Sequence, residues 1–319
     1  MPPRVFITRT LPETVMIAMT RRFEVLRAEP DRPLSAAEIA HGARDCEGLV
    51  SMLSDPIGDT VLAACPKLRV VANFAAGTNN VDLAAAKRRG ITVTNTPGVL
   101  TEATADMAFA LLLAVARRIV EGDALTRSGR WNGWGPTQLL GQGVQARRLG
   151  IVGMGRIGQA VARRAQGFGM DVVYHNRHRV DERTERSLDC HWVPLDELLR
   201  TSDYISLHCP LTPETRNLLS AEAFRTIKHG AYLINTARGE VVDEDAMIDA
   251  LESGALSGAG LDVYTGEPRV NPRILALSNV VAAPHAGSAT YATRDRMGMM
   301  VFDNLSAALA GQTPPNRVV

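Results

Sequence analysis

The sequence predicts an α/β protein with two parallel β-sheets. Short apolar segments alternate with Ala-rich, helix-like segments along the whole chain, which is the pattern of successive βα units. A glycine-rich turn at residues 153–158 follows one of these strands, and further βα units come after it. The length of 319 residues is sufficient for two domains that each bury a core. We therefore expect two domains, each built on its own sheet.

The first series of units contains four expected strands: Val5–Ile7, Gly48–Leu53, Leu68–Ala72 and Ile91–Val93. One helix is expected to begin after Ser35, because Glu38 stands three residues later and the two can form a capping box. Another helix is expected over residues 80–89, with Gly90 as its stop. These elements would form the first sheet and part of its helical cover.

The second series follows a long expected helix over residues 101–118 and a loop at residues 129–136. Its six expected strands are Leu149–Val152, Val172–His175, Tyr204–His208, Tyr232–Asn235, Gly260–Val263 and Val280–Ala283. The amphipathic segment 289–310 is expected to be a helix that returns the chain to the first domain. The predicted domains are therefore residues 1–98 plus 289–319, which is discontinuous, and residues 99–288.

The composition excludes several classes of protein. With 35 basic and 34 acidic residues the formal charge is +1, so neither nucleic acid nor an anionic membrane surface is expected as a partner. No apolar stretch reaches the ~20 residues of a membrane-spanning helix. The four cysteines are scattered and no apolar leader begins the chain, which favours a cytoplasmic protein. Cys190–His191 and His208–Cys209 lack the spacing of a tetrahedral site, so no metal is expected.

A Gly-x-Gly-x-x-Gly pattern follows the first expected strand of the second series. The pattern is weak evidence alone, but the strand before it and the helix-like segment after it supply the context of a dinucleotide-binding turn. Gly153 would form the tight turn, Gly155 would let the backbone approach a pyrophosphate, and Gly158 would let helix and strand pack closely. The amides of Arg156 and Ile157 would face the phosphates at the helix N-terminus. A glycine-rich turn without a ligand is the alternative.

The residues after the next expected strand bear on the choice of cofactor. An NAD-selective site normally places Asp or Glu about 20 residues after the glycines, where it binds the ribose hydroxyls. The sequence has Asn176 instead, followed by Arg177 and Arg179. An amide and guanidinium groups can donate hydrogen bonds to a 2′-phosphate, whereas a carboxylate would repel it. NADP(H) is therefore expected to be preferred, with NAD(H) as an alternative. Both arginines could instead form only a solvated edge of the sheet.

Three polar residues follow later strands. Arg238 should project over the carboxyl edge of the sheet, where its guanidinium can bind a carboxylate bidentately and polarise a keto oxygen. His285 begins the loop after the last strand, and imidazole, with an ordinary pKa near ~6.5, can exchange a proton with a reacting carbonyl oxygen. Glu267 can orient that ring and favour its charged form. Taken singly, each residue has a structural alternative: an ion pair, a structural histidine or a loop carboxylate.

Seven segments together resemble the D-isomer-specific 2-hydroxyacid dehydrogenase family, and within it the glyoxylate and hydroxypyruvate reductases. They are residues 73–82, 95–106, 153–158, 208–215, 235–243, 261–268 and 284–288. The resemblance implies two Rossmann-like or flavodoxin-like parallel-sheet domains, with the active site in the cleft between them. The discontinuous domain would be the substrate-binding (catalytic) domain and the other the dinucleotide-binding domain.

The resemblance also implies roles for the three polar residues. Arg238 would bind the substrate, Glu267 would support the histidine, and His285 would be the catalytic acid and base. Formate dehydrogenases of this superfamily carry Gln where Glu267 stands, which argues against that branch.

Further residues match family positions that line the substrate and the cofactor. The loop at Leu53 and the amides of Ala76 and Gly77 would close on the substrate carboxylate. The positions that match the cofactor lining are Thr104, Pro210, Thr215, Thr236, Ala237, Asp262 and Gly287. Of these, Asp262 would lie near the nicotinamide amide.

Family members are usually homodimers that pair through their nucleotide domains, and the same is expected here. Trp131 and Trp134 lie in the loop that resembles the dimer-contact region, so one of them would reach the active site of the neighbouring subunit. Ordinary core tryptophans are the alternative.

The sequence therefore favours NADPH-dependent reduction of small 2-keto acids, such as glyoxylate and hydroxypyruvate, to D-2-hydroxy acids. An NAD-dependent D-lactate-type or D-3-phosphoglycerate dehydrogenase is one alternative. A dinucleotide-sensing binding protein without turnover, like the corepressors built on this fold, is another. Neither the preferred keto acid nor the physiological direction follows from the sequence.

Overall fold

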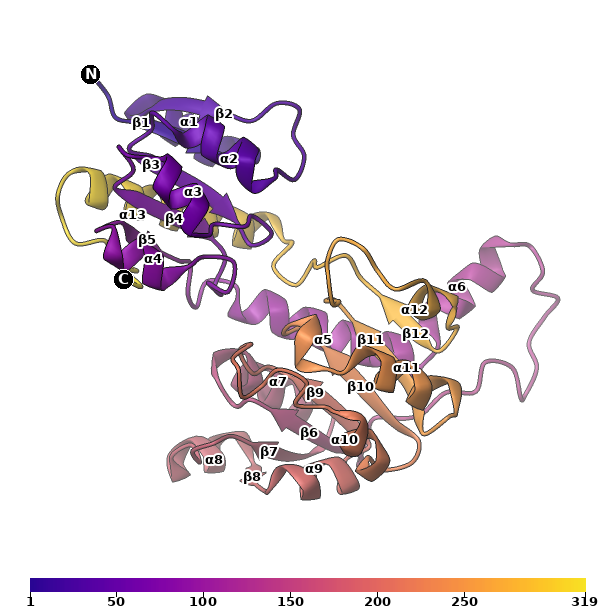
Figure 1. The fold of residues 1–319 in the computed structure, drawn as a ribbon. Coiled ribbons are helices and arrows are strands. Elements are labelled where there is room, and N and C mark those ends of the chain that lie inside the picture. The colour runs from indigo at the N-terminus through magenta and orange to yellow at the C-terminus, as the bar shows by residue number, and fades with distance from the viewer. The chain divides into compact units, whose positions relative to one another are not determined.

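The chain forms two α/β units, each with a parallel sheet, as the sequence predicts (Figure 1). The computed structural model describes all residues from 1 to 319. Unit 1 comprises residues 1–100 and 288–319, and unit 2 comprises residues 101–287. The first boundary lies after residue 100, where residue 98 was expected, and the second lies before residue 288, where residue 289 was expected.

Unit 1 contains a five-stranded sheet in the order β2-β1-β3-β4-β5. Its strands are β1 (Arg4–Ile7), β2 (Glu24–Arg27), β3 (Gly48–Met52), β4 (Val70–Phe74) and β5 (Thr92–Thr94). The sequence analysis missed β2, because Glu-Val-Leu-Arg at a sheet edge is only half-buried and contains no apolar run. All pairings in the sheet are parallel, so the carboxyl ends of β3 and β4 meet at one edge.

The helices of unit 1 cover both faces of its sheet. They are α1 (Glu13–Arg22), α2 (Ala36–Ala43), α3 (Asp59–Ala64), α4 (Leu83–Arg88) and α13 (Tyr291–Leu309). The expected capping box at Ser35 and Glu38 is present at the start of α2. Alternate residues of β3 belong to different cores, since Leu49 packs with α2 and α3 whereas Val50 packs with α1 and α13. The return of the chain through α13 therefore completes the core of unit 1.

Unit 2 contains a seven-stranded parallel sheet in the order β12-β11-β10-β9-β6-β7-β8. The strands are β6 (Arg148–Val152), β7 (Asp171–His175), β8 (Cys190–Trp192), β9 (Tyr204–Leu207), β10 (Ala231–Asn235), β11 (Leu256–Leu261) and β12 (Val280–Ala282). The expectation of six strands was wrong, because β8 is a three-residue edge strand with two exposed residues and gives no sequence signal. The strand order reverses between β6 and β9, and open α/β sheets bind ligands at the carboxyl ends of strands at such a point.

The helices of unit 2 pack on opposite faces of the sheet. They are α5 (Thr101–Ala116), α6 (Ile119–Arg127), α7 (Arg156–Gly167), α8 (Glu182–Leu188), α9 (Leu195–Thr201), α10 (Ala221–Thr226), α11 (Glu244–Glu252) and α12 (Pro272–Ala276), with a 3-10 turn, η1 (Gly239–Val241). Helices α5 and α7 share one core, and α9, α10 and α11 share the other. In β11, a Cβ at Gly260 would lie 2.8 Å from Leu111, so the glycine lets α5 approach the sheet closely.

Helix α6 and the loop after it carry exposed apolar residues. No residue of α6 is buried. Trp131 is 53% exposed and Trp134 is 83% exposed, so neither is a core tryptophan of this chain. Measured by length and hydropathy, no helix of the chain is suited to crossing a bilayer.

Candidate active site

The glycine fingerprint forms the turn between β6 and α7. Gly153 has φ +103°, and a Cβ there would lie 2.5 Å from the amide nitrogen of Cys209. A Cβ at Gly158 would lie 2.1 Å from the carbonyl oxygen of Gly153. No atom lies within 4 Å of a Cβ placed at Gly155, which leaves that side of the turn open. Two of the glycines thus shape the turn, and the third provides a cradle that a phosphate can enter.

Gly155 is the N-cap of α7, and Arg156 and Ile157 begin the helix. The first amides of a helix have no intrahelical partners and carry the positive end of its dipole. These residues fit the pyrophosphate of a dinucleotide because an open cradle and helix amides meet at one point.

A cavity of ≈ 380 Å³ adjoins the fingerprint turn. Six of the predicted cofactor residues line it: Gly153, Gly155, Asn176, Arg177, Pro210 and Thr215. The sequence analysis did not assign eight other lining residues to the cofactor: Val152, His175, His178, His208, Cys209, Thr212, Glu214 and Leu218. A signal that could have found them exists for His178, between the two noted arginines, and for His208, Cys209, Thr212 and Glu214, inside the 208–215 segment.

The loop after β7 carries the residues expected to select the cofactor. Asn176 accepts a hydrogen bond from the amide of Met154 through Oδ1 (2.8 Å), so it supports the fingerprint turn. Arg177 is exposed and lines the cavity. Arg179 instead binds Glu185 through Nε and Nη2, at 2.7 and 2.5 Å. That Arg179 binds the cofactor stays a prediction, and in this chain its guanidinium is paired with a carboxylate of α8.

Arg238 lies in the turn between β10 and η1, which the chain holds tightly. Oδ1 of Asn235 accepts a hydrogen bond from the amide of Ala237 (3.0 Å), and Nδ2 of Asn235 donates one to the carbonyl oxygen of Arg238 (2.9 Å). The next residue, Gly239, packs against the backbone of Tyr264, where a Cβ would lie 2.0 Å from the carbonyl carbon. Burial lowers the pKa of Arg238, and the charge of nearby carboxylates opposes that effect.

His285 and Glu267 form a direct pair. Nδ1 of His285 lies 2.7 Å from Oε2 of Glu267, and Oε1 of Glu267 accepts a hydrogen bond from the amide of Tyr264 (2.9 Å). Burial disfavours the carboxylate, but the hydrogen bond and charge of His285 together with Arg238 outweigh burial and lower the pKa of Glu267. Glu267 therefore stays ionised near neutral pH, directly beside the imidazole ring of His285.

The backbone of His285 is held in an unusual conformation. Its φ of +53° lies in the left-handed region, which is uncommon for a residue with a side chain. The buried carboxylate of Asp262 accepts hydrogen bonds from the next two amides, those of Ala286 (2.7 Å) and Gly287 (2.8 Å). Burial raises the pKa of Asp262, opposed by these two bonds. Asp262 thus fixes the loop in which His285 lies.

Three other predicted cofactor residues, Thr104, Thr215 and Thr236, also lie in unit 2. Thr104 lies beside Gly287, where a Cβ would come within 3.4 Å of its methyl group. Thr236 is buried and its hydroxyl has no hydrogen-bond partner in the chain. Thr215 donates to the carbonyl oxygen of Pro210 (2.6 Å) and so shapes the wall of the cavity.

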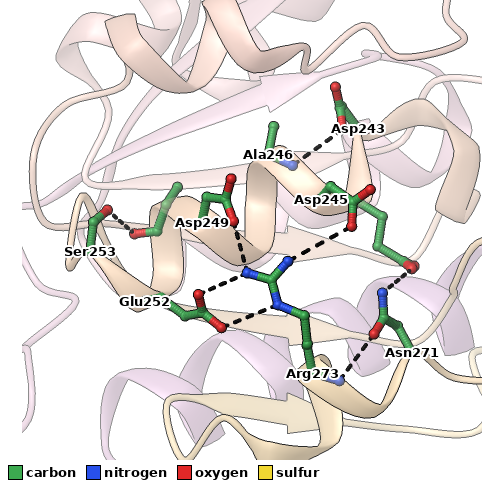
Figure 2. Close-up of polar contacts among 10 residues, drawn as sticks. Asp243, Asp245, Ala246, Asp249, Glu252, Ser253, Asn271 and Arg273 are labelled. Carbon is green, nitrogen blue, oxygen red and sulfur yellow. Dashed lines mark hydrogen bonds and ion pairs between the residues drawn. The ribbon is translucent and has the colours of Figure 1, made fainter.

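The segment that carries Glu267 is anchored to α11 by a network of charges. Figure 2 shows Arg273 of α12 directed at the carboxylates of α11, with ion pairs of 2.8 Å to Asp249 and to Glu252. Asn271 donates to Glu244 of the same helix (3.3 Å). A single exposed ion pair stabilises little, but several on one guanidinium restrict where α12 can lie. The far end of the Glu267 loop is thereby fixed.

The predicted substrate residues Leu53, Ala76 and Gly77 belong to unit 1. They follow β3 and β4, and Asn73 links β3 to the loop after β4 by accepting from Ser51 (2.9 Å) and donating to the carbonyl oxygen of Gly77 (2.9 Å). The amides of Ala76 and Gly77 donate no hydrogen bond within unit 1. They meet the chemical requirement for binding a carboxylate, but their role stays a prediction.

No group of three or more histidine, cysteine or acidic side chains is arranged to hold a metal ion. All four cysteines are free and buried. The polar groups described above are an arginine, a histidine–carboxylate pair and an open turn at a helix N-terminus.

Comparison with known proteins agrees with this arrangement. Residues 109–287 match the family model of the D-isomer specific 2-hydroxyacid dehydrogenase, NAD binding domain. The chain is 50% identical to a glyoxylate reductase of Korarchaeum cryptofilum, over 100% of this chain and 96% of that protein. It is 47% identical to a glyoxylate reductase of Thermococcus litoralis, over 100% and 97% of the two chains.

A solved structure extends the likeness to the fold. It is an NADPH-dependent glyoxylate/hydroxypyruvate reductase from Sinorhizobium meliloti in complex with NADP and malonate. This chain superimposes on it with a TM-score of 0.88 and 34% identity, over 100% of this chain and 97% of the other. The fold, the family model and the full-length relatives agree, and the chain belongs to the D-isomer-specific 2-hydroxyacid dehydrogenase family.

Proposed function

We propose that the protein uses NADPH to reduce small 2-keto acids, glyoxylate and hydroxypyruvate, to D-2-hydroxy acids. The observation that carries the proposal is the 2.7 Å contact between His285 and Glu267 in the same unit as Arg238 and the fingerprint turn. The glyoxylate reductase names of the relatives support the choice of small keto acids.

In this proposal His285 is the acid and base. Because Nδ1 is directed to Glu267, Nε2 is the atom that gives a proton to the carbonyl oxygen and regains one afterwards. Glu267 stabilises the imidazolium and fixes the ring. The bound dinucleotide supplies the hydride that reaches the carbonyl carbon.

Arg238 would bind the substrate carboxylate and polarise the keto oxygen. A guanidinium offers two parallel N–H donors, which fixes the plane of a 2-keto acid as well as its charge. Leu53, Ala76 and Gly77 would complete the binding of the carboxylate from unit 1.

For the cofactor, we propose NADP(H) as the preferred dinucleotide, with Arg177 as the partner of its 2′-phosphate. No carboxylate stands at the end of β7 to bind the ribose hydroxyls, and Arg177 lines the cavity. The bound NADP of the Sinorhizobium meliloti relative supports this choice. The remaining predicted residues would surround the rest of the cofactor.

The deciding experiment measures initial rates of nicotinamide absorbance change with NADPH and then NADH, against glyoxylate, hydroxypyruvate, pyruvate and 2-ketogluconate. Fast turnover of the first two acids with NADPH is expected. Preference for pyruvate with NADH would favour a D-lactate-type enzyme instead. Tight NADPH binding without turnover of any acid would favour a dinucleotide sensor.

We also propose a cytoplasmic homodimer in which α6 and the following loop contact the neighbouring subunit. Ile119 and Val120 are both more than half exposed, as are Trp131 and Trp134, which is unfavourable in a lone chain. Sedimentation velocity is expected to give twice the 34.4 kDa of one chain, and a single-chain mass would contradict the dimer. Four unpaired cysteines are consistent with a reducing compartment.

A further inference from the structure

The loop between β7 and α8 is fastened to the rest of unit 2 at both of its ends. At the first end, the amide of Met154 donates to Oδ1 of Asn176 (2.8 Å), and the indole of Trp192 donates to the carbonyl oxygen of Asn176 (3.0 Å). The loop therefore leaves the sheet in a direction that the fingerprint turn and β8 both determine.

At the second end, three side chains form a network that we call the loop lock: Tyr174, Arg179 and Glu185. The hydroxyl of Tyr174 donates to Glu185 (2.6 Å) and accepts from the amide of Val180 (3.0 Å). Arg179 binds both carboxylate oxygens of Glu185, at 2.7 and 2.5 Å. Tyr174 is fully buried, and Glu185 is 7% exposed. The hydrogen bond from Arg179 lowers the pKa of Glu185 to about 2, so Glu185 stays ionised near neutral pH and keeps its pair with Arg179.

Only Arg177 and His178 lie between the two fastened ends, and both line the cavity beside the fingerprint turn. A loop this short has few conformations once each end is fixed, so the lock determines where the Arg177 guanidinium can reach. Within the lock, the guanidinium of Arg179 is already paired with the carboxylate of Glu185.

We propose that Glu185, with Tyr174 and Arg179, positions Arg177 against the cofactor 2′-phosphate and thereby sets the preference for NADPH over NADH without touching the cofactor. This inference rests on the proposed function, because it assumes that Arg177 contacts that phosphate. Glu185 and Tyr174 are positioning residues, and Arg179 acts through Glu185.

Direct binding of the phosphate by Arg179 makes the opposite prediction. If Arg179 could serve as a ligand, Glu185→Gln would release it and would strengthen binding of the 2′-phosphate. If the lock positions Arg177, the same substitution loosens the loop and weakens that binding. The sign of one measured change therefore separates the two.

The test uses the full-length protein and calorimetric titration with adenosine 2′,5′-bisphosphate and with adenosine 5′-monophosphate. In Glu185→Gln, affinity for the bisphosphate should fall about three- to tenfold, with affinity for the monophosphate unchanged. Tyr174→Phe should also lower the ratio of bisphosphate affinity to monophosphate affinity, because the amide of Val180 loses its hydrogen-bond acceptor. The matched control is Glu182→Gln on the same helix. Glu182 forms an ion pair with exposed Arg186 (3.2 Å) and acts on Arg179 only through its charge, without a hydrogen bond, so this substitution should leave both affinities unchanged.

A lower melting temperature in Glu185→Gln with an unchanged affinity ratio would mean a purely structural network and would overturn the inference. A rise in bisphosphate affinity would also overturn it, in favour of Arg179 as a ligand. If Arg177→Ala loses bisphosphate affinity and Glu185→Gln does not, the inference alone fails. If the unmodified protein binds the bisphosphate no more tightly than the monophosphate, the proposed cofactor preference fails and the inference fails with it.

Discussion

Nδ1 of His285 lies 2.7 Å from Oε2 of Glu267, although the two residues come from different loops 18 positions apart in the sequence. Each loop is held separately, the first by Asp262 and the second by α11, so the contact is built before a substrate arrives. Preorganisation of this kind places a proton donor at a defined point.

Replacement of the histidine tests its role as acid and base. In His285→Ala, kcat should fall about 10²- to 10⁴-fold, the range for loss of a positioned general acid. NADPH affinity, measured by fluorescence titration, should stay unchanged because the imidazole would act only on the carbonyl oxygen. His229→Ala, at an exposed position, is the matched control. A variant at position 285 with the rate of the unmodified protein would exclude the acid–base assignment.

Replacement of the carboxylate tests the pH dependence. Glu267→Gln keeps an oxygen near Nδ1 but removes the carboxylate, whose pKa the fold lowers, so kcat/KM should fall at neutral pH and should lose the decline that protonation of Glu267 causes at low pH. An unchanged profile would mean that Glu267 only fills space.

The same substitution tests a linkage to stability. The folded protein lowers the pKa of Glu267 below its ordinary 4.5, so ionisation of this group stabilises the fold above that pH and the contribution is lost as the pH falls through the folded pKa. The difference in unfolding free energy between the unmodified protein and Glu267→Gln should therefore be larger at pH 7 than at pH 3 in urea titrations.

Replacement of Arg238 by lysine tests whether the two parallel donors of the guanidinium are needed. Arg238→Lys keeps the charge but loses the two parallel donors, so kcat/KM for glyoxylate should fall about ten- to a hundredfold. Affinity for NADPH should change little. Equal activity of the lysine variant would show that charge alone is sufficient at this position.

Arg177→Ala tests the cofactor preference. Affinity for NADPH should fall about ten- to a hundredfold, the effect of losing a charged hydrogen bond, while affinity for NADH stays close to that of the unmodified protein. Binding titrations with both cofactors check this. Equal losses for the two cofactors would exclude a role at the 2′-phosphate.

Gly239→Ala tests the packing that places Arg238. The added Cβ would lie 2.0 Å from the carbonyl carbon of Tyr264, so the turn must move, at a cost of about 1–3 kcal/mol in unfolding free energy. Activity should fall with stability because Arg238 and Glu267 lie on the two sides of this contact. Gly167→Ala, where no atom lies within 4 Å of the new Cβ, is the control and should be neutral or slightly stabilising.

The fold class could be predicted from the sequence because buried parallel strands are apolar runs with clear stops. The edge strands β2 and β8 escaped because each is short and partly exposed, with polar residues where a central strand has apolar ones. Local signals with a specific geometry, such as Ser35 with Glu38, were reliable since both partners lie within one helical turn.

The candidate site was predictable in part for a similar reason. The fingerprint turn and the loops of Arg238 and His285 follow strands, so the topology alone brings them to one edge. The pairing of Arg179 with Glu185 could not be predicted, because it depends on how α8 packs against β7. Neither could the positive φ of His285, which depends on the buried carboxylate of Asp262.

The positions of the four cysteines have a practical consequence. Cys46 and Cys65 lie in unit 1, and Cys190 and Cys209 lie in unit 2, all at 9% exposure or less. Burial raises the pKa of the Cys46 and Cys190 thiols to about 11, so a thiol reagent reaches them only when the surrounding unit opens. Each unit therefore contains two cysteines whose rate of labelling reports how often that unit opens. Thiol labelling of single-cysteine variants, followed by mass spectrometry, would measure the opening rate of each unit separately. The cysteines used are those already present in the chain.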